Sequence, residues 1–274
     1  MKRFNSQRAF SLLELIFVIV ILGIITAMGS EMIVKVYSQY IIQRGQHRAS
    51  LKTELAALQI ANRLSMAIPG TVFRRNATTG GTIESVNDAM SLAGDSYIAL
   101  QWVSADVDSF NATATPGWSG FCDVDASSGT VISTPGSDLD KANDIMLNLA
   151  AGTLPPNSPS LYFPYDAASY PTASLAGGTD AITLNSAATH IVEHYKLAWS
   201  SYALVVDNNN DLYLHYNFDP TPRVTIGAKR SLIMKDITTF KFKGAGRTIR
   251  FKICKEEQIG EDFNITACKE KAVF

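Results

Sequence analysis

The chain has 274 residues, which is long enough for one large domain or two small ones. Hydrophobic residues make up 46 % of it, so a sizeable buried core is possible even though an apolar N-terminal stretch inflates that fraction. The formal net charge of −1 excludes a strongly basic protein and gives no general reason to expect nucleic acid as a partner. The charges are unevenly placed. Residues 84–144 contain ten acidic side chains and one basic, whereas residues 229–255 contain nine basic and one acidic.

An uncharged stretch near the N-terminus, residues 15–30, has the composition of a membrane span. As a helix with a rise of about 1.5 Å per residue it would be about 24 Å long, slightly short of a bilayer core. A complete span therefore recruits residues 10–13 and, with them, Glu14. A carboxylate at the edge of a membrane helix costs about 2–3 kcal/mol, so we expect Glu14 to have a function and a partner.

The residues around Glu14 resemble a known signal. The run from residue 9 to residue 15, preceded by a short basic leader and followed by the apolar stretch, reads Ala-Phe-Ser-Leu-Leu-Glu-Leu. It resembles the processing signal of type IV prepilins and of type II secretion minor pseudopilins. The resemblance implies that a prepilin peptidase cuts between Ala9 and Phe10 and methylates the new amine, and that Glu14 is the assembly residue. Ala9 stands where the family usually has Gly.

Two other interpretations of the N-terminus are open. An ordinary secretory signal peptide would be cut near Ser30, and a plain signal anchor would not be cut at all. Both leave Glu14 without a role, and the helical pattern continues beyond Ser30.

No helix breaker appears between Ser30 and the Pro-Gly pair at residues 69–70, so the sequence predicts one helix from about Phe10 to about Ala67. Its second half is expected to pack on a globular domain through a stripe of apolar residues at helical spacing: Leu51, Leu55, Leu58, Ala61, Leu64 and Ile68. The predicted organisation is a leader at 1–9, a transmembrane helix half at 10–30, an amphipathic helix half at 31–69, a variable loop-rich region at 70–180 and an antiparallel β-sheet region at 181–274.

Within the loop-rich region, residues 97–103, 145–149 and 161–163 are short apolar pieces that we expect to form strands. In the last region, residues 202–206 and 212–218 are expected to form a hairpin, one face of which carries Leu212, Leu214, Tyr216 and Phe218.

A second hairpin is expected from residues 239–243 and 248–254. Alternation points one set of side chains inward, Phe240, Phe242, Ile249, Phe251 and Ile253, and a basic set outward, Lys241, Lys243, Arg250 and Lys252. A long helix packed on a C-terminal antiparallel β-sheet is an α+β fold, and it is also the pilin-like architecture that the resemblance implies.

Three cysteines allow three single bridges. We favour Cys254–Cys268, which closes a short loop worth about 3 kcal/mol in the chain-entropy account. It also resembles the C-terminal disulfide loop of many pilins. The alternative is that both thiols are unpaired and buried, and Cys122 is left over in either case.

Two motifs suggest metal sites only weakly. Residues 190–194 match H-x-x-E-H, a zinc-peptidase motif, but the following residues have β character and no third ligand is placed for the metal. Asp207, Asn209 and Asp211 have the spacing of a calcium loop without its closing glutamate, so a solvated hairpin turn is the favoured interpretation. We expect neither a metal nor another cofactor.

The outward basic residues of the second hairpin could hold DNA phosphates or an acidic neighbouring subunit, but a solvated face is the favoured interpretation. No aromatic residue interleaves with them, so nucleic acid is not an expected partner. No nucleophile with a base, phosphate loop or C-x-x-C is present, and we do not expect an enzyme.

Together these features predict a membrane-anchored minor pilin or pseudopilin subunit, assembled into a type IV pilus-like filament for secretion, adhesion or uptake. Its expected partners are the prepilin peptidase, other pilin or pseudopilin subunits and the bacterial inner membrane. The N-terminus would be cytoplasmic and the globular part periplasmic or in an extracellular filament. The alternative is a membrane-tethered extracytoplasmic binding protein that does not assemble.

Overall fold

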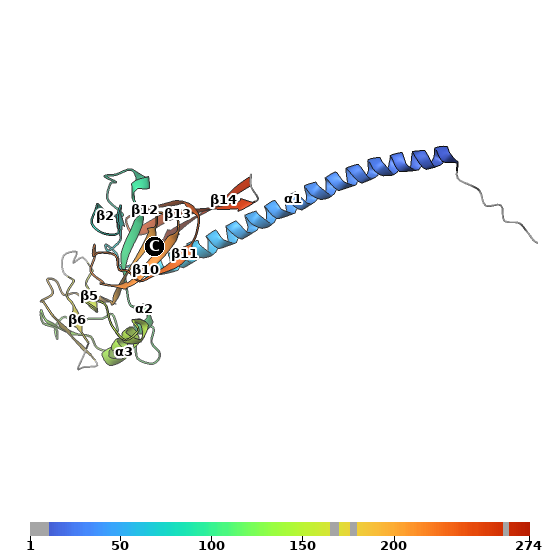
Figure 1. The fold of residues 1–274 in the computed structure, drawn as a ribbon. Helices are drawn as coiled ribbons and strands as arrows, with labels where there is room; N and C mark the ends of the chain where they lie inside the picture. Colours follow the sequence, from blue (N-terminus) through green and yellow to red (C-terminus); the bar gives the residue numbers. More distant parts are fainter. Residues whose placement is uncertain (1–10, 165–169, 176–179, 260–262) are drawn as a thin grey trace, which may run out of the picture.

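The computed structural model describes residues 11–164, 170–175, 180–259 and 263–274. Its longest element is helix α1 (Leu12–Leu64), whose 53 residues extend about 80 Å without a break. The Ser11 hydroxyl caps the helix by accepting a hydrogen bond from the backbone N–H of Glu14 at 3.3 Å. The first half of α1 projects away from the body, and the second half lies against it (Figure 1). The predicted long helix is confirmed.

The larger of the two sheets beside α1 is antiparallel and six-stranded. From edge to edge its strands are β11 (Arg230–Met234), β10 (Leu212–Phe218), β9 (Ser200–Val206), β3 (Ala99–Ser104), β1 (Phe73–Arg75) and β2 (Ile83–Ser85). A 3₁₀ turn, η1 (Gly94–Ser96), precedes β3.

The first predicted hairpin is confirmed as β9 and β10, but two of its four expected inward residues are not in the core beneath α1, and one of these, Tyr216, is only half-buried. Leu212 and Leu214 pack in the core beneath α1, whereas Phe218 packs in a separate cluster with Val205 and other apolar residues. The register of β10 against β9 shifts between residues 215 and 218, and Asn217 in that interval has φ +52°. Such a bulge breaks the two-residue alternation and sends Phe218 to the other face.

The second sheet consists of β12 (Ile237–Ala245), β13 (Thr248–Ile259) and β14 (Phe263–Val273), all antiparallel. The predicted second hairpin is β12 with β13, and its five inward apolar residues are buried in the core as expected. The four outward basic side chains are exposed, also as expected. β14 adds a third strand along the other edge of β13.

The main core lies where the second half of α1 meets both sheets. The helix presents a narrow face of mostly small residues, with buried side chains at Ala49, Thr53, Ala56, Ala57, Ile60 and Leu64. The Thr53 hydroxyl donates to the Ala49 carbonyl oxygen at 2.7 Å, so its polar group is satisfied inside the helix.

The predicted leucine stripe is therefore only partly right. Leu64 and Ile68 are buried, but Leu51, Leu55 and Leu58 are 50 %, 60 % and 41 % exposed. The small residues let the helix approach β14 closely, and bulky leucines at the same positions would hold it away. The leucines consequently point outward, to a face of the helix that no other part of the described chain covers.

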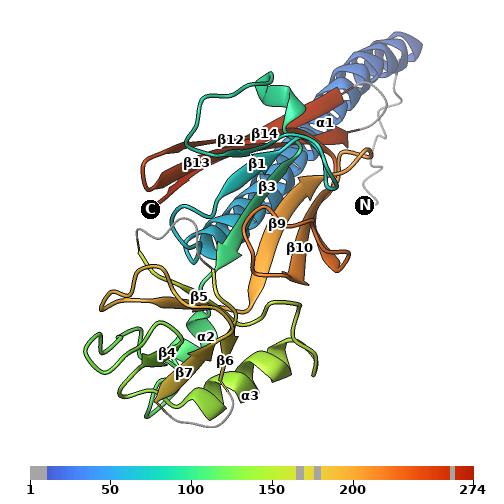
Figure 2. The same cartoon turned by 90° about the vertical axis from the view of Figure 1, so that its left-hand side faces the viewer.

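Residues 105–199 form a second lobe, which we call the inserted lobe because it leaves at the end of β3 and returns at the start of β9, two strands that pair with each other. Figure 2 shows it below the two sheets. Its described residues form the helices α2 (Val107–Phe110) and α3 (Leu139–Leu149), a sheet ordered β4 (Val131–Ser133), β7 (Ala181–Leu184) and β6 (Ala173–Ser174), and the pair β5 (Ser160–Tyr162) with β8 (Lys196–Ala198).

The inserted lobe has a hydrophobic core of its own, which includes Trp118, Ile132, Met146, Leu161 and Leu197. The predicted boundary at residues 180/181 does not coincide with a division in the structure, since β1 to β3 belong to the main sheet and the lobe extends to residue 199. Residues 145–149, expected as a strand, lie in α3, which Asp138 caps by accepting the Lys141 backbone N–H.

Candidate functional site

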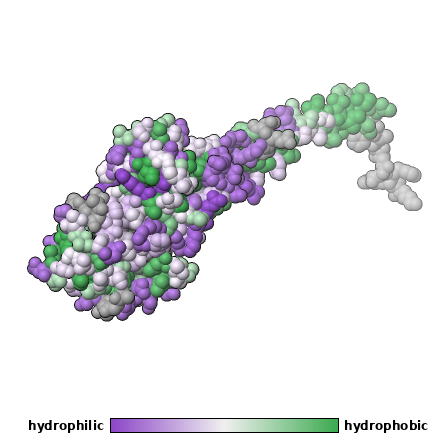
Figure 3. All heavy atoms as spheres, turned by 60° about the vertical axis from the view of Figure 1, so that its left-hand side comes forward, coloured by the Kyte–Doolittle hydropathy of each residue, from purple (hydrophilic) through white to green (hydrophobic). Residues whose placement is uncertain are grey.

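The first half of α1 is an apolar helix with nothing packed on it. Residues 11–28 are exposed on every side, and the apolar atoms gather at the far end of the molecule (Figure 3). By length and composition, α1 is the single helix in the described part of the chain that is apolar enough to cross a membrane. Its hydroxyls are satisfied within the helix: Thr26 donates to the Leu22 carbonyl at 2.6 Å and Ser30 to the Ala27 carbonyl at 3.0 Å.

Glu14 is the exception in this half. It lies in the first turn of α1, where the positive end of the helix dipole favours a carboxylate. Among the described residues, no donor or cation contacts its carboxylate. The expected cleavage residues, Ala9 and Phe10, lie outside the described residues, and Phe10 directly precedes the capping Ser11.

The two other glutamates of α1, Glu31 and Glu54, both form ion pairs within the chain. Glu31, beyond the apolar run, pairs with Lys35 at 2.8 Å one turn later. Glu54 accepts from Lys271 at 2.7 Å and lies 3.3 Å from Lys269, both on β14. The hydrogen bond from Lys271, followed by that from Lys269, holds the pKa of Glu54 below its ordinary value. Glu14 is thus the one carboxylate of α1, within its described span, that has no partner in the chain.

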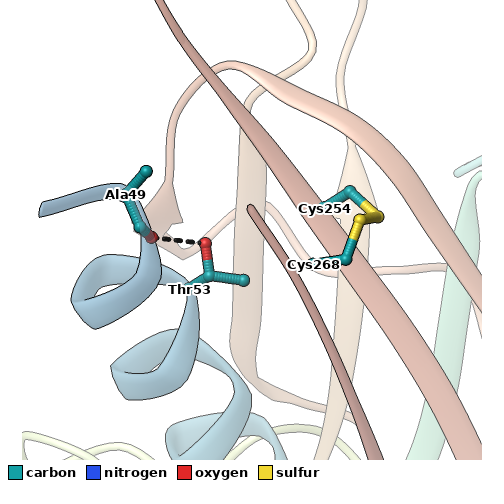
Figure 4. Close-up of a disulfide and its surroundings, with 4 residues drawn as sticks. All are labelled: Ala49, Thr53, Cys254 and Cys268. Carbon is teal, nitrogen blue, oxygen red and sulfur yellow. Dashed lines mark hydrogen bonds between the residues drawn. A yellow bond between two sulfur atoms is a disulfide. The ribbon is translucent and has the colours of Figure 1, made fainter. Parts of the chain in front are cut away.

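Cys254 and Cys268 lie directly opposite each other on β13 and β14 and form a disulfide with a Cα–Cα distance of 4.1 Å. The bridge lies on the sheet face opposite the one that packs on α1, near the level of Ala49 and Thr53 (Figure 4). Cys122 is a free thiol, fully buried in the inserted lobe, and burial raises its pKa.

The weak metal motifs gain no support. His190 and His194 are exposed and lie in a loop, whereas the zinc motif needs a helix to put both on one face. Asp207 Oδ1 accepts the backbone N–H groups of Asn209 and Asp211, each at 2.9 Å, so it stabilises the β9–β10 turn. The described residues contain no group of three or more His, Cys, Asp or Glu side chains that could hold a metal ion.

The outward basic residues lie opposite one another on the neighbouring strands β12 and β13: Lys241 is opposite Lys252, and Lys243 is opposite Arg250. Lys241 forms an ion pair with Asp95 of η1, in which Nζ and Oδ1 are 2.8 Å apart. Side chains on this face are exposed, and their arrangement favours neither DNA nor a neighbouring subunit over solvent as what contacts them.

Two groups of charged residues were not anticipated from the sequence. Glu84 accepts hydrogen bonds from Ser91, Tyr97 and the buried Arg74, and these donors, the Ser91 hydroxyl first, lower its pKa to about 2. Asp106, at the start of the inserted lobe, is 2 % exposed. Its Oδ1 accepts the Ser109 backbone N–H, whereas its Oδ2 has no hydrogen-bond partner among the residues that the structure describes, and burial raises its pKa to about 6.

Residues 4–30 match the family model described as the prokaryotic N-terminal methylation motif. No curated protein and no solved structure gave a match to the chain. The matched segment includes Ala9, Phe10 and Glu14, so the resemblance noted from the sequence is confirmed for this segment. A motif of this kind indicates a structural subunit. The chain therefore carries a prepilin-type cleavage and methylation signal at its N-terminus. This signal supports the interpretation of the chain as a member of the type IV pilin-like and pseudopilin family.

Proposed function

We propose that the protein is a membrane-anchored minor pilin or pseudopilin subunit, cut between Ala9 and Phe10 by a prepilin peptidase and assembled into a type IV pilus-like filament for secretion, adhesion or uptake. The apolar half of α1 holds the uncut protein in the bacterial inner membrane. The N-terminus is cytoplasmic, because the basic leader stays inside, and the globular part is periplasmic or carried in the filament.

The observation that carries this proposal is the unpartnered carboxylate of Glu14 on an otherwise apolar and uncovered helix. Moving a charge out of water costs several kcal/mol unless an opposite charge accompanies it. Cleavage before Phe10 creates a positively charged amine four residues upstream. On a neighbouring subunit this amine pairs with Glu14, so that each charge neutralises the other inside an apolar helix bundle.

A second feature supports assembly beyond the membrane. Leu51, Leu55 and Leu58 lie on one face of α1 at a spacing of three to four residues and are largely exposed. They form a separate apolar patch on the outward side of the second half, beyond the polar stretch at residues 43–48. Helices of neighbouring subunits can bury this face, which the chain itself leaves to solvent.

Mass spectrometry of the mature N-terminus tests the processing step. N-methylated Phe10 is the expected result. An intact Met1 would identify a signal anchor, and a start at Ser30 would identify an ordinary signal peptide. Either of these would overturn the proposal. An intact Met1 would favour a membrane-tethered extracytoplasmic binding protein that does not assemble, whereas a start at Ser30 would mean that the apolar span is removed from the mature protein.

Replacing Glu14 tests the assembly step. We expect Glu14→Ala to insert into the membrane and to be cut normally, but to be missing from sheared filaments. The matched control is Glu31→Ala, which removes a carboxylate from the same helix beyond the apolar run and should assemble as the wild type does. Normal incorporation of Glu14→Ala would contradict the proposed pairing.

A further inference from the structure

A cavity of about 840 Å³ lies between the inserted lobe and the rest of the body, and we call it the interlobe groove. The segment after α1 and strand β1 form one wall, and residues at the ends of β5 and β8 form the other. Its apolar lining includes Tyr170, Pro69, Pro164 and Pro222, and small exposed parts of Phe73 and Tyr162, which are 5 % and 4 % exposed. The Tyr162 and Tyr170 rings lie 5.2 Å apart. This volume is typical of a ligand site.

Three cations line the interlobe groove: Lys196, Arg223 and Arg247. They come from three separate segments, namely the start of β8, the connection from β10 to β11 and the turn between β12 and β13. Within the described chain none of them lies in an ion pair with a carboxylate. Partial burial, with repulsion from Arg247 as a smaller cause, lowers the pKa of Lys196, which stays partly exposed to solvent. The groove therefore gathers positive charge that the described chain does not neutralise.

Arg223 is held there in an unfavourable backbone conformation. It follows Pro222 in a turn closed by the Val224 backbone N–H and the Thr221 carbonyl oxygen, and its φ is +65°. Gly or Asn normally occupies such a position. The Arg223 guanidinium instead lies 4.8 Å from the centre of the Phe73 ring, at the apolar wall of the groove. A strained residue that positions a charge over an aromatic wall is typical of a functional site.

The lining limits the chemistry of the occupant. Its described residues include no Asp, Glu, Asn or Gln, so the charged side chains offer donors and the remaining polar ones are hydroxyls. A carboxylate, which only accepts hydrogen bonds, suits these donors. A hydroxyl-rich sugar would bury many donors against aromatic and prolyl walls that offer few acceptors. The groove lies beyond the far end of α1, about 50 Å along the helix from Ser30, which places it away from bilayer lipid.

We propose that the interlobe groove binds an acidic peptide segment of a partner protein, with an aromatic or aliphatic side chain against Tyr170 and the prolyl walls and carboxylates paired to Lys196, Arg223 and Arg247. The site is remote from the helix face used in assembly. The inference does not depend on filament formation, and it is tested on the unassembled chain.

The probe is a fluorescein-labelled peptide that alternates Glu and Phe, titrated by fluorescence anisotropy against the full chain in phosphatidylcholine nanodiscs. We expect saturable binding that weakens as salt is added, because exposed charges are screened. A peptide with Gln in place of Glu, and one with Ser in place of Phe, should each bind at least about tenfold more weakly, since both the charge and the apolar side chain contribute.

The informative variant is Arg223→Gly, because Gly suits the positive φ and the turn should keep its fold while the cation is removed. We expect its affinity for the peptide to fall about tenfold, and that of Lys196→Gln to fall similarly. Arg250→Gln is the matched control: it removes an exposed cation from β13 that does not line the groove, and it should bind as the wild type does.

Three results would overturn the proposal. One is equal binding of the Glu and Gln peptides, and another is unchanged affinity in Arg223→Gly. The third is stronger competition by oleate or by polyglucuronate than by the unlabelled peptide, which would identify a lipid or a glycan as the occupant.

Discussion

The two halves of α1 differ in what surrounds them. In the second half, small side chains lie against β14, the apolar residues on that face are buried, and Glu54 is paired with two lysines. In the first half every side is exposed and Glu14 is unpaired. One continuous helix thus combines a part whose interactions are complete within the chain with a part whose interactions must come from outside it.

This difference separates stability from assembly. Changes to the inward face of the second half should alter the free energy of unfolding, because they remove contacts that exist in the isolated chain. Changes to the first half should alter membrane insertion and assembly and leave the fold unaffected.

Ile60→Ala should destabilise the fold most. Ile60 is 2 % exposed in the main core, and removing a buried side chain of this size costs about 3–4 kcal/mol. Leu58→Ala is the matched control, because Leu58 lies on the same helix but faces outward, and its loss should cost less than about 1 kcal/mol. Urea unfolding of the full chain in detergent measures both. Equal losses would show that the outward face is also packed within the chain.

Removing the disulfide should have the next largest effect. The double variant Cys254→Ser, Cys268→Ser removes the bridge between two cysteines that are 14 residues apart in the sequence. This change should lower the free energy of unfolding by about 3 kcal/mol. Because the bridge lies on the sheet face opposite α1, the helix should keep its position on β14. Peptide mapping without reductant should find Cys254 linked to Cys268 and Cys122 free; a bridge to Cys122 would contradict the structure.

Asp106 shows what it costs this chain to bury a carboxylate without a full set of partners. Its pKa is raised from 3.8 to about 6, so between these values the unfolded chain loses this proton while the folded chain keeps it. The free energy of unfolding therefore falls as the pH rises from about 4 to about 6, and this contribution is constant above that. Asp106→Asn should remove the fall and gain about 1–2 kcal/mol at pH 7. An unchanged pH profile would contradict this assignment.

Local patterns in the sequence were sufficient for the long helix and for both hairpins of the last region. Alternation over residues 239–254 separates phenylalanines from lysines because each strand of that sheet has one buried and one solvated face. The prepilin-type signal is likewise a contiguous run, so it could be recognised without any knowledge of the fold.

The orientation of the second half of α1 could not be predicted in the same way. Hydropathy favours Leu51, Leu55 and Leu58 as the inward face, yet close approach to β14 favours Ala49, Thr53 and Ala56. The lysines that fix Glu54 come from more than 200 residues later in the chain. For the same reason the interlobe groove was missed, since its three cations belong to separate segments that only the folded topology brings together.

Glu54→Gln should give the smallest effect of the series, a loss smaller than that of any other destabilising variant, because its ion pairs are partly exposed to water. Lys271 and Lys269 hold the Glu54 pKa below its ordinary 4.5, so the folded chain keeps the charge when the unfolded chain has gained a proton. The stabilisation is complete above that pH and is lost as the pH falls through the folded-state pKa. Glu54→Gln should therefore differ from the wild type at pH 7 and converge with it in acid. Glu14→Gln should leave the unfolding of the globular body unchanged both at pH 7 and in acid, because its carboxylate has no partner in the described chain and lies on the part of α1 that packs on no other element. If Glu14→Gln also shifted the unfolding curve, the first half of α1 would contribute to the fold and the separation between its two halves would fail.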